Sequence, residues 1–327
     1  MKTSKYAWMA AAVLALAACN NDEEFTDNGP AAAQITAGVS GPATRAIDNQ
    51  WEADEIGVMV TDAPTSNMET LYKNVKYTTT SNTTSANFTA AEGEGIFFQD
   101  ADEKVTFAAY APYQKTDGYA ILPGTAADGV VSGSTADQST REKQKAFDYI
   151  FASGATASRA NTTVSFTGGN AFSHKMSRLI IVLKTSTTDG FSAEEVKDGT
   201  YTLEGLNHSG TFNVTTGEAK AKTTETSTQV ESWSLTDYSL ETDDDTQKTK
   251  TFTSILYPQT YTALTLKAVI AGQTYTAALD GIEDNTLVSG YSYTYTVTVK
   301  KTGLKVESCT IASWTEGGSY NGDATMK

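Results

Sequence analysis

The chain has 327 residues and carries 39 acidic against 24 basic side chains, which gives a formal net charge of −15. This balance argues against binding to nucleic acid, because no surplus of Lys and Arg is available to neutralise phosphates. About one residue in six is Thr, and together with Ser and 16 Tyr this composition favours β-sheets over helical bundles. The length suggests roughly two domains, each large enough to bury its own core.

The N-terminal segment has the features of an export signal. Lys2 and Lys5 precede an uncharged, mostly apolar stretch that ends at Ala18 and is too short to cross a bilayer as a helix. Its last residues, Leu16-Ala17-Ala18-Cys19, resemble the lipobox of bacterial lipoproteins, in which the cysteine is acylated and becomes the mature N-terminus. We predict a signal peptide at 1–18 and lipid on Cys19, with an ordinary signal peptide as the alternative. Cys309 then has no partner for an internal disulfide.

A single strand-like segment precedes the globular part of the chain. The segment 34–40, with the sequence QITAGVS, places Ile35, Ala37 and Val39 on one face, and Gly41-Pro42 ends it. Trp51 begins the globular region.

Short runs typical of β-strands follow at roughly even spacing, which is the pattern of a β-sandwich or barrel. We predict strands at 55–62, 74–80, 105–113, 147–153, 178–184, 200–206, 210–217, 252–259, 264–270 and 273–279. The stretch 130–145 is predicted to be a loop, 191–197 is the best candidate for a short helix, and a domain boundary is expected near Gly168-Gly169.

The clearest predicted strand is YSYTYTVTVK at 291–300. Tyr291, Tyr293, Tyr295, Val297 and Val299 alternate with Ser and Thr, a strict period of two. We expect the first set to face a core and the second set to face water.

Candidate catalytic residues are sparse. His174 and His208 are interpreted as hydrogen-bonded structural residues at sheet edges, and the acidic run Asp243-Asp244-Asp245 as a solvated loop, because it lacks the alternating ligands of a calcium loop. The sequence contains no G-x-S-x-G, H-E-x-x-H or P-loop motif. We therefore predict no enzymatic activity, no metal site and no cofactor.

Several motifs in a fixed order resemble one family. The lipobox is followed by Thr44-Arg45-Ala46, then by Trp51 and an I-G-V strand. Further along come VTFAAYAPY, FDYIFAS, AFSHKMSRLIIVLK, ILYPQT, SGYSYTYTVTV and TIASWTEGG. This order is similar to that of the fimbrillins of Bacteroidetes, the Mfa-like and FimA-like pilins of type V pili, and it spans nearly the whole chain.

The resemblance implies an all-β protein with two tandem transthyretin-like β-sandwich domains, at 46–168 and 169–327. It also implies export as an outer membrane lipoprotein, and removal of the segment 19–45 by a trypsin-like protease that cuts between Arg45 and Ala46. The mature subunit would then polymerise with other pilin subunits by strand exchange, forming a surface fimbrium for cell adhesion.

The order of the segments agrees with such an assembly. The strand 34–40 lies between Cys19 and Arg45, so cleavage would disconnect Ile35, Ala37 and Val39 and free the slot that they cover. We place the replacing strand in the C-terminal tail 310–327. Its candidate contact residues are Ile311, Trp314, Tyr320, Ala324 and Met326. Ile311 and Trp314 could instead complete the second domain of their own subunit.

Two functions from other classes remain as alternatives. One is a monomeric surface lipoprotein that binds glycans through exposed aromatic rings, with Trp51, Trp233 and Trp314 as candidates. The other is an exported hydrolase with an unrecognised pair of acidic residues.

Overall fold

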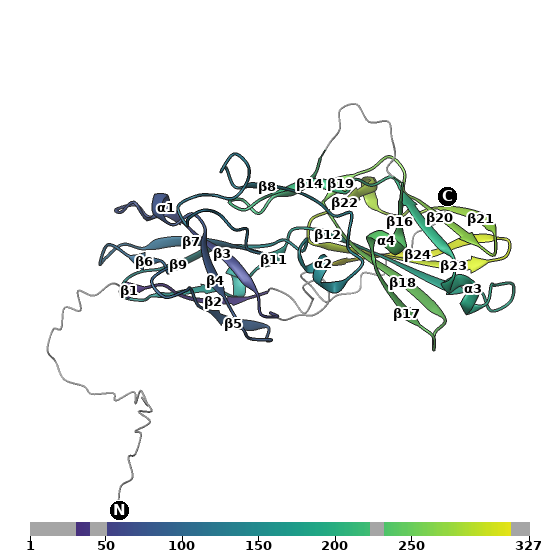
Figure 1. The fold of residues 1–327 in the computed structure, drawn as a ribbon, viewed down its shortest axis with the longest axis horizontal. Coiled ribbons are helices and arrows are strands. Elements are labelled where there is room, and N and C mark those ends of the chain that lie inside the picture. The colour runs from purple at the N-terminus through teal and green to yellow at the C-terminus, as the bar shows by residue number, and fades with distance from the viewer. Residues whose placement is uncertain (1–30, 40–50, 223–231, 315–327) are drawn as a thin grey trace, which may run out of the picture. The chain divides into compact units, whose positions relative to one another are not determined.

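The computed structural model describes residues 31–39, 51–222 and 232–314 (Figure 1). Strands make up most of the secondary structure of these residues, and their helices are all shorter than two turns. The prediction of an all-β fold is confirmed. No helix in these described ranges is long and apolar enough to cross a membrane.

Two sheets contribute to the first core. One has five strands in the order β11-β9-β7-β3-β4, and the other has three in the order β10-β2-β5. Their bounds are β2 Gln34–Gly38, β3 Glu55–Asp62, β4 Val75–Thr78, β5 Ser85–Phe88, β7 Val105–Ala111, β9 Ile150–Ala157, β10 Thr163–Phe166 and β11 Ser173–His174.

Two further sheets contribute to a second core. Their strand orders are β17-β18-β12-β23-β24 and β16-β13-β20-β21. Their bounds are β12 Ser177–Thr185, β13 Thr200–Glu204, β16 Ser232–Ser234, β17 Leu240–Asp244, β18 Thr249–Leu256, β20 Thr265–Ile270, β21 Gln273–Ala278, β23 Tyr291–Lys300 and β24 Gly303–Ser313. Strand β23 lies between a parallel partner, β12, and an antiparallel partner, β24.

Strand β23 has the predicted bounds and nearly the predicted faces. Tyr293, Tyr295, Val297 and Val299 are buried in the second core, as their alternation predicts. Two residues differ: Tyr291 is 40% exposed, and Ser292, which was expected to face water, is buried at 5% exposure. Tyr291 is the first residue of the strand and lies outside the core cluster that begins two residues later.

The stretch predicted as a loop at 130–145 contains a strand and a helix, so that prediction is wrong. Strand β8, Val130–Ser134, pairs with β14, Ser209–Asn213, which pairs in turn with β15, Ala219–Ala221. Gly133 and Gly210 face each other in this ladder, and a Cβ at either one would lie within 2.8 Å of Tyr257. These glycines let the sheet approach the Tyr257 ring. Because Gly133 has no side chain, β8 lacks the alternation of apolar and polar residues from which a strand is predicted.

A third core cluster lies between this sheet and the five-stranded sheet of the first core. It includes Met59, Tyr110, Tyr149, Phe212 and Trp314, so side chains from both halves of the chain share it. The rings of Tyr149 and Phe212 stack with centroids 4.4 Å apart.

The remaining elements are short. They are the strand pairs β1 Ala31–Ala32 with β6 Phe97–Phe98 and β19 Gln259–Thr260 with β22 Thr286–Leu287, the helices α1 Met68–Leu71, α2 Arg141–Lys145, α3 Ala193–Lys197 and α4 Leu235–Tyr238, and the 3₁₀ turns η1 Gly168–Asn170 and η2 Glu283–Asn285. Helix α3 lies inside the predicted helical range and begins with a capping box between Ser192 and Glu195.

Strand β11 pairs with β9, so the pairing of the first five-stranded sheet continues past Gly168-Gly169 to His174.

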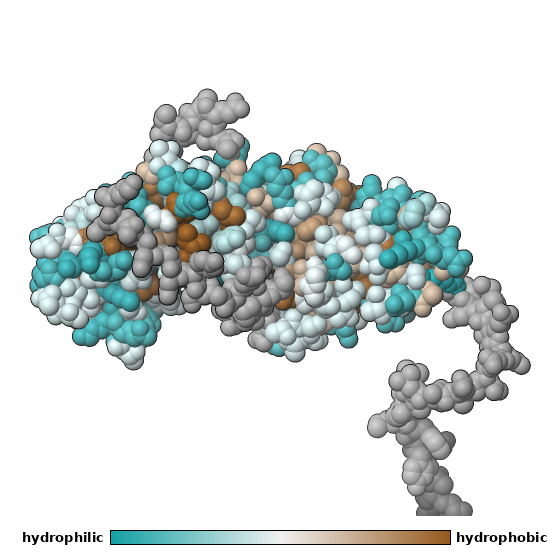
Figure 2. Space-filling model, turned by 180° about the vertical axis from the view of Figure 1, so that it is seen from behind, coloured by the Kyte–Doolittle hydropathy of each residue, from teal (hydrophilic) through white to brown (hydrophobic). Residues whose placement is uncertain are grey.

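The surface is not uniformly polar despite the net charge of the chain. Figure 2 shows patches of hydrophobic residues among hydrophilic ones on one face of the molecule. The large hydrophobic side chains that are most exposed among the described residues are Tyr119, Ile121, Val288 and Tyr291.

Candidate strand-exchange site

Strand β2 occupies the middle of the three-stranded sheet of the first core. It pairs in parallel with β10, where Ile35 lies beside Val164, and antiparallel with β5, where Ile35 lies beside Phe88. The pairing continues at both ends, since the N–H of Gln34 donates to Thr162 O at 2.9 Å and the N–H of Phe172 donates to Gly38 O at 2.9 Å. Without β2, β10 and β5 would each lose their neighbour in this sheet.

The predicted inward face of this segment is confirmed in its main residues. Ile35 is 1% exposed and Ala37 is fully buried, whereas Val39 is half-buried and packs at the edge of the same cluster. On the opposite face Thr36 Oγ1 donates to Asn87 Oδ1 at 2.8 Å. The strand ends at Gly38, and Val39 forms an isolated parallel bridge with Phe172.

Trp51 ties the start of the globular region to β2. Its indole N–H donates to Ala37 O at 2.9 Å, and its ring makes edge contacts with Phe88 and Phe172 at centroid distances of 4.9 and 5.3 Å. The interval between Val39 and Trp51 therefore begins and ends at residues packed in the first core. Arg45 and Ala46 belong to this interval and lie outside the described residues, as does Cys19.

A surface groove of about 420 Å³ runs along the N-terminal end of β2. Ala32 to Thr36 form one side, and Phe88, Tyr77 and the turn that includes Gly95 form the other. The Tyr77 hydroxyl accepts the N–H of Ile96 at 2.9 Å, and burial raises the pKa of this hydroxyl to about 12. The groove is thus lined by apolar side chains together with uncharged polar ones, and none of its lining residues is charged.

Two of the other arginines lie in a helix or strand, and the third lies in a turn between two strands. Arg141, which we predicted to lie in a loop, is the first residue of α2 and forms an ion pair with Glu52. The Thr140 side chain caps this helix by accepting the N–H of Lys143 at 3.3 Å. Arg178 lies in β12, where its Nε donates to Ser292 Oγ at 2.9 Å, and Arg159 follows β9 in the turn before β10.

The C-terminal candidates divide into two groups. Ile311 belongs to β24 and lies beside Tyr293 of β23, so it forms part of a sheet of its own subunit. Trp314 is fully buried, and its backbone N–H donates to Gly290 O at 2.6 Å. The placement of these two residues in a donor strand is therefore corrected, because both pack within their own subunit: Ile311 in the β23–β24 ladder and Trp314 in the third core cluster. Tyr320, Ala324 and Met326 lie outside the described residues.

Trp314 is held from both sides. Its ring stacks on His174 with a centroid distance of 4.0 Å and an interplanar angle of 2°, and the guanidinium carbon of Arg178 lies 5.0 Å from its centroid. His174 Nδ1 lies 2.7 Å from Asp148 Oδ1, and both side chains are fully buried. Burial lowers the pKa of Arg178, and the charge of Asp148 opposes that shift. The C-terminal segment 315–327 therefore follows directly after a buried, tightly packed residue.

The candidates for chemistry have structural roles. His174 packs against Trp314 as described above, and His208 lies 3.2 Å from Thr135 Oγ1. The acidic run includes the end of β17, where Lys197 Nζ lies 3.1 Å from Asp243 and 3.8 Å from Asp245. Among the described residues, no group of three or more His, Cys, Asp or Glu side chains could hold a metal ion.

The three tryptophans proposed as glycan platforms are not at the surface. Trp51 and Trp314 are fully buried and Trp233 is 2% exposed. Each packs in a core cluster, so the alternative of a glycan-binding lipoprotein loses these three candidate residues.

Comparison with protein families gives one match over most of the chain. A family model described as fimbrillin-like matches residues 44–314. The matched region begins at the Thr-Arg-Ala motif and ends at Trp314, so it includes both halves of the described fold.

Individual relatives agree with this match. The chain is 30% identical to a protein of Bacteroides uniformis provisionally named fimbrium subunit Fim1C, over 96% of each chain. Two crystal structures, both of provisionally assigned cell adhesion proteins, are similar in fold. The one from Bacteroides ovatus has 27% identity, a TM-score of 0.69 and coverage of 88% of this chain and 98% of that one. The one from Bacteroides uniformis has 25% identity, a TM-score of 0.64 and coverage of 88% and 99%.

Proposed function

The chain belongs to the fimbrillin-like family, and from this premise we propose that it is a structural subunit of a surface fimbrium that serves cell adhesion. Its partners would be other pilin subunits, and its role would be non-catalytic and without a cofactor. The observation that carries the proposal is the position of β2, a central strand of the first core that precedes the Thr-Arg-Ala motif in the chain.

We propose that the precursor is exported with a signal peptide at 1–18 and is held at the outer membrane by lipid on Cys19. Several acyl chains would be needed for stable anchoring, because one chain binds membranes only marginally. Changing Cys19 to Ala should release the precursor from the membrane fraction. An unmodified Cys19 in precursor extracted from membranes would contradict this step.

The mature subunit would consist of two tandem transthyretin-like β-sandwich domains. The two main core clusters, each bordered by two sheets, support this division. Because β11 pairs with β9, the first domain would extend beyond the predicted 46–168 to about His174, and the second would begin with β12.

A trypsin-like protease would cut between Arg45 and Ala46 and so trigger assembly. Arg45 follows Gly41-Pro42 in a stretch of small residues, whereas Arg141 and Arg178 belong to a helix and to a central strand. A protease must draw its substrate into an extended form, which ordered elements resist. After the cut, β2 would remain in place through non-covalent contacts alone.

Strand exchange would then replace β2 with a strand from a neighbouring subunit. Removal of β2 leaves unpaired backbone groups on β10 and β5 above an apolar floor, which is a template for an added strand. We propose that this donor comes from the tail 315–327, with Tyr320, Ala324 and Met326 on its apolar edge. An extended tail of that length reaches roughly 40 Å, more than the roughly 17 Å that a five-residue strand requires.

A disulfide that locks β2 tests this proposal directly. Thr36 and Asn87 face each other across β2 and β5, and directly opposed antiparallel residues have Cα atoms about 4.5–5.5 Å apart, within the range that a disulfide spans. In the double variant Thr36→Cys/Asn87→Cys, an oxidised bond should hold β2 in its slot. Exported subunits should then be cut at Arg45 yet stay monomeric on unboiled denaturing gels.

The controls separate locking from misfolding. The single variant Thr36→Cys should polymerise normally, and a reductant should restore polymers in the double variant. If the oxidised double variant, with the disulfide verified by mass spectrometry, forms polymers in normal amounts, β2 is not the strand that is exchanged.

A further inference from the structure

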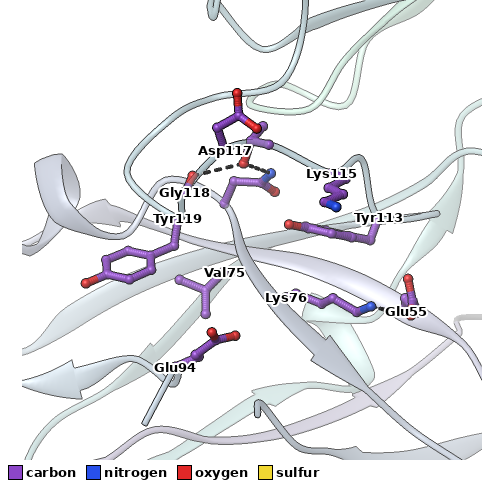
Figure 3. Close-up of a pocket in the computed structure, with 11 residues that line it drawn as sticks. Glu55, Val75, Lys76, Glu94, Tyr113, Lys115, Asp117, Gly118 and Tyr119 are labelled. Carbon is purple, nitrogen blue, oxygen red and sulfur yellow. Dashed lines mark hydrogen bonds and ion pairs between the residues drawn. The ribbon is translucent and has the colours of Figure 1, made fainter. Parts of the chain in front are cut away.

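A second recess lies in the first half of the chain, separate from β2 and its groove. It has a volume of about 560 Å³, within the range of about 300–1,000 Å³ typical of small-molecule sites. Its walls come from β3, β4, the turn at Glu94 and the loop that follows β7. Figure 3 shows Tyr119 and Tyr113 on opposite sides of Val75, with Glu94 on a third side.

The loop that forms the upper wall is firmly held. The buried side chain of Asn74 donates to Gln114 O at 2.8 Å and to Thr116 Oγ1 at 3.1 Å, and it accepts a hydrogen bond from the Tyr110 hydroxyl at 2.7 Å. The carbonyl of Tyr119 accepts the N–H groups of both Lys73 and Asn74 at 2.8 Å. The recess is therefore preformed, and a ligand would not have to order this loop.

One aromatic ring in this recess is exposed and supported from behind. Tyr119 is 49% exposed, the largest value among the exposed large hydrophobic side chains of the described residues. Its ring stacks on buried Tyr72, with centroids 5.7 Å apart and an interplanar angle of 26°. Packing on Tyr72 restrains the orientation of the ring, while about half of the residue surface stays exposed.

Three charged side chains of the recess have no partner within the described ranges. Glu55 pairs with Lys76 at 2.5 Å, but the side chains of Glu94, Lys115 and Asp117 make no hydrogen bond or ion pair with any described residue. An acceptor and a donor are therefore both available on the walls of the same recess. This combination disfavours a purely apolar ligand, because burying these groups without hydrogen bonds would cost free energy.

We infer that this recess binds a neutral sugar residue of a glycan. A pyranose ring has an apolar face of C–H groups that can stack on Tyr119 and hydroxyls that can donate to the Glu94 carboxylate, and the Lys115 ammonium across the recess can donate to a hydroxyl of the same glycan. An anionic sugar fits less well, because the side chains that line the recess include Glu55, Glu94 and Asp117 against two lysines. The assignment does not depend on strand exchange, since the recess exists in the single chain.

Saturation-transfer NMR on the full chain carrying Cys19→Ala tests the inference. The probes are the methyl glycosides of galactose, mannose, fucose and N-acetylglucosamine, each at about 10 mM, with sialic acid as the anionic probe. At least one neutral glycoside should give signals, strongest for the C–H protons of one ring face, and sialic acid should give none. If none of the neutral glycosides binds, the inference is overturned.

Substitutions of lining residues test whether the glycoside binds at this recess. Tyr119→Ala should weaken binding about tenfold or more through loss of the stacked ring, and Lys115→Ala should weaken it by up to about tenfold through loss of a charged donor. Tyr119→Trp should retain it. Tyr291→Ala is the matched control, because Tyr291 is a similarly exposed tyrosine on β23. Unchanged binding in Tyr119→Ala, with circular dichroism confirming its fold, would also overturn the inference.

Discussion

The change Ile35→Ala should weaken the precursor and leave the polymer unaffected. Ile35 is 1% exposed and is flanked by Phe88 on one strand and Val164 on the other. Truncating a buried isoleucine to alanine costs about 2–5 kcal/mol, from lost burial and from the cavity that remains. A site closed by neighbours on both sides relaxes little, so we expect about 3 kcal/mol or more.

The polymer should not lose this free energy, because β2 would have left the subunit. Val164→Ala supplies the matched comparison, since Val164 is fully buried in β10 and stays in the mature subunit. It should cost the precursor about 2 kcal/mol and should weaken the polymer as well. The two variants thus differ in one respect, which is whether the altered residue is still present after assembly.

Two measurements test the comparison. Urea unfolding of the precursors, made uncleavable by Arg45→Ala, gives the loss of free energy for each variant. Heating polymers in detergent before electrophoresis gives the temperature at which half of the ladder disappears. If Ile35→Ala lowers that temperature as much as Val164→Ala does, β2 remains in the polymer and the exchange of this strand is refuted.

Three further predictions follow from the C-terminal region and from a buried histidine. Deleting Ser319 to Lys327 should leave a folded, exported and cleaved subunit that forms no ladder on unboiled gels, and a normal ladder would move the donor elsewhere. Trp314→Ala should lower the free energy of unfolding by about 3–5 kcal/mol in urea titrations, because a fully buried ring is lost from the third core cluster, and a loss below about 1 kcal/mol would contradict that packing. Burial lowers the pKa of His208 from 6.5 to about 4, so between these pH values the unfolded chain binds a proton that the folded chain does not. Stability should therefore fall by up to about 3 kcal/mol as the pH drops from 6.5 towards 4, and His208→Gln should remove that part of the pH dependence.

The elements that could be predicted well are those whose side chains alternate along a half-buried strand. Strand β23 has the predicted bounds, since its aromatic and valine residues alternate with Ser and Thr. Strand β3 also has them, although it is recognised by a mostly apolar run from Ile56 to Val60 between polar ends. The inward face of β2 was predictable from Ile35 and Ala37 for the same reason. Local periodicity reports which residues are buried, and it does so without knowledge of the partner strand.

Features that depend on a distant partner could not be predicted. Strand β8 has Gly133 in its middle and acquires its ladder from β14, far along the chain. The burial of Trp51, Trp233 and Trp314 follows from three different clusters, and a tryptophan has no local pattern that separates a core ring from a surface platform. The recess at Tyr119 was missed because its walls come from four separated segments.

The same limit applies to β2, whose role depends on where it sits rather than on what it is. Its five residues alone do not indicate which strands it pairs with. In the structure β2 lies between β5 and β10, so it joins two strands from distant parts of the sequence in one sheet. A central strand is harder to remove than an edge strand, because two ladders and an apolar face must be given up together. Exchange should therefore be slow unless the incoming strand forms its pairs as β2 leaves, and a polymer formed in this way would gain lasting stability from the same barrier.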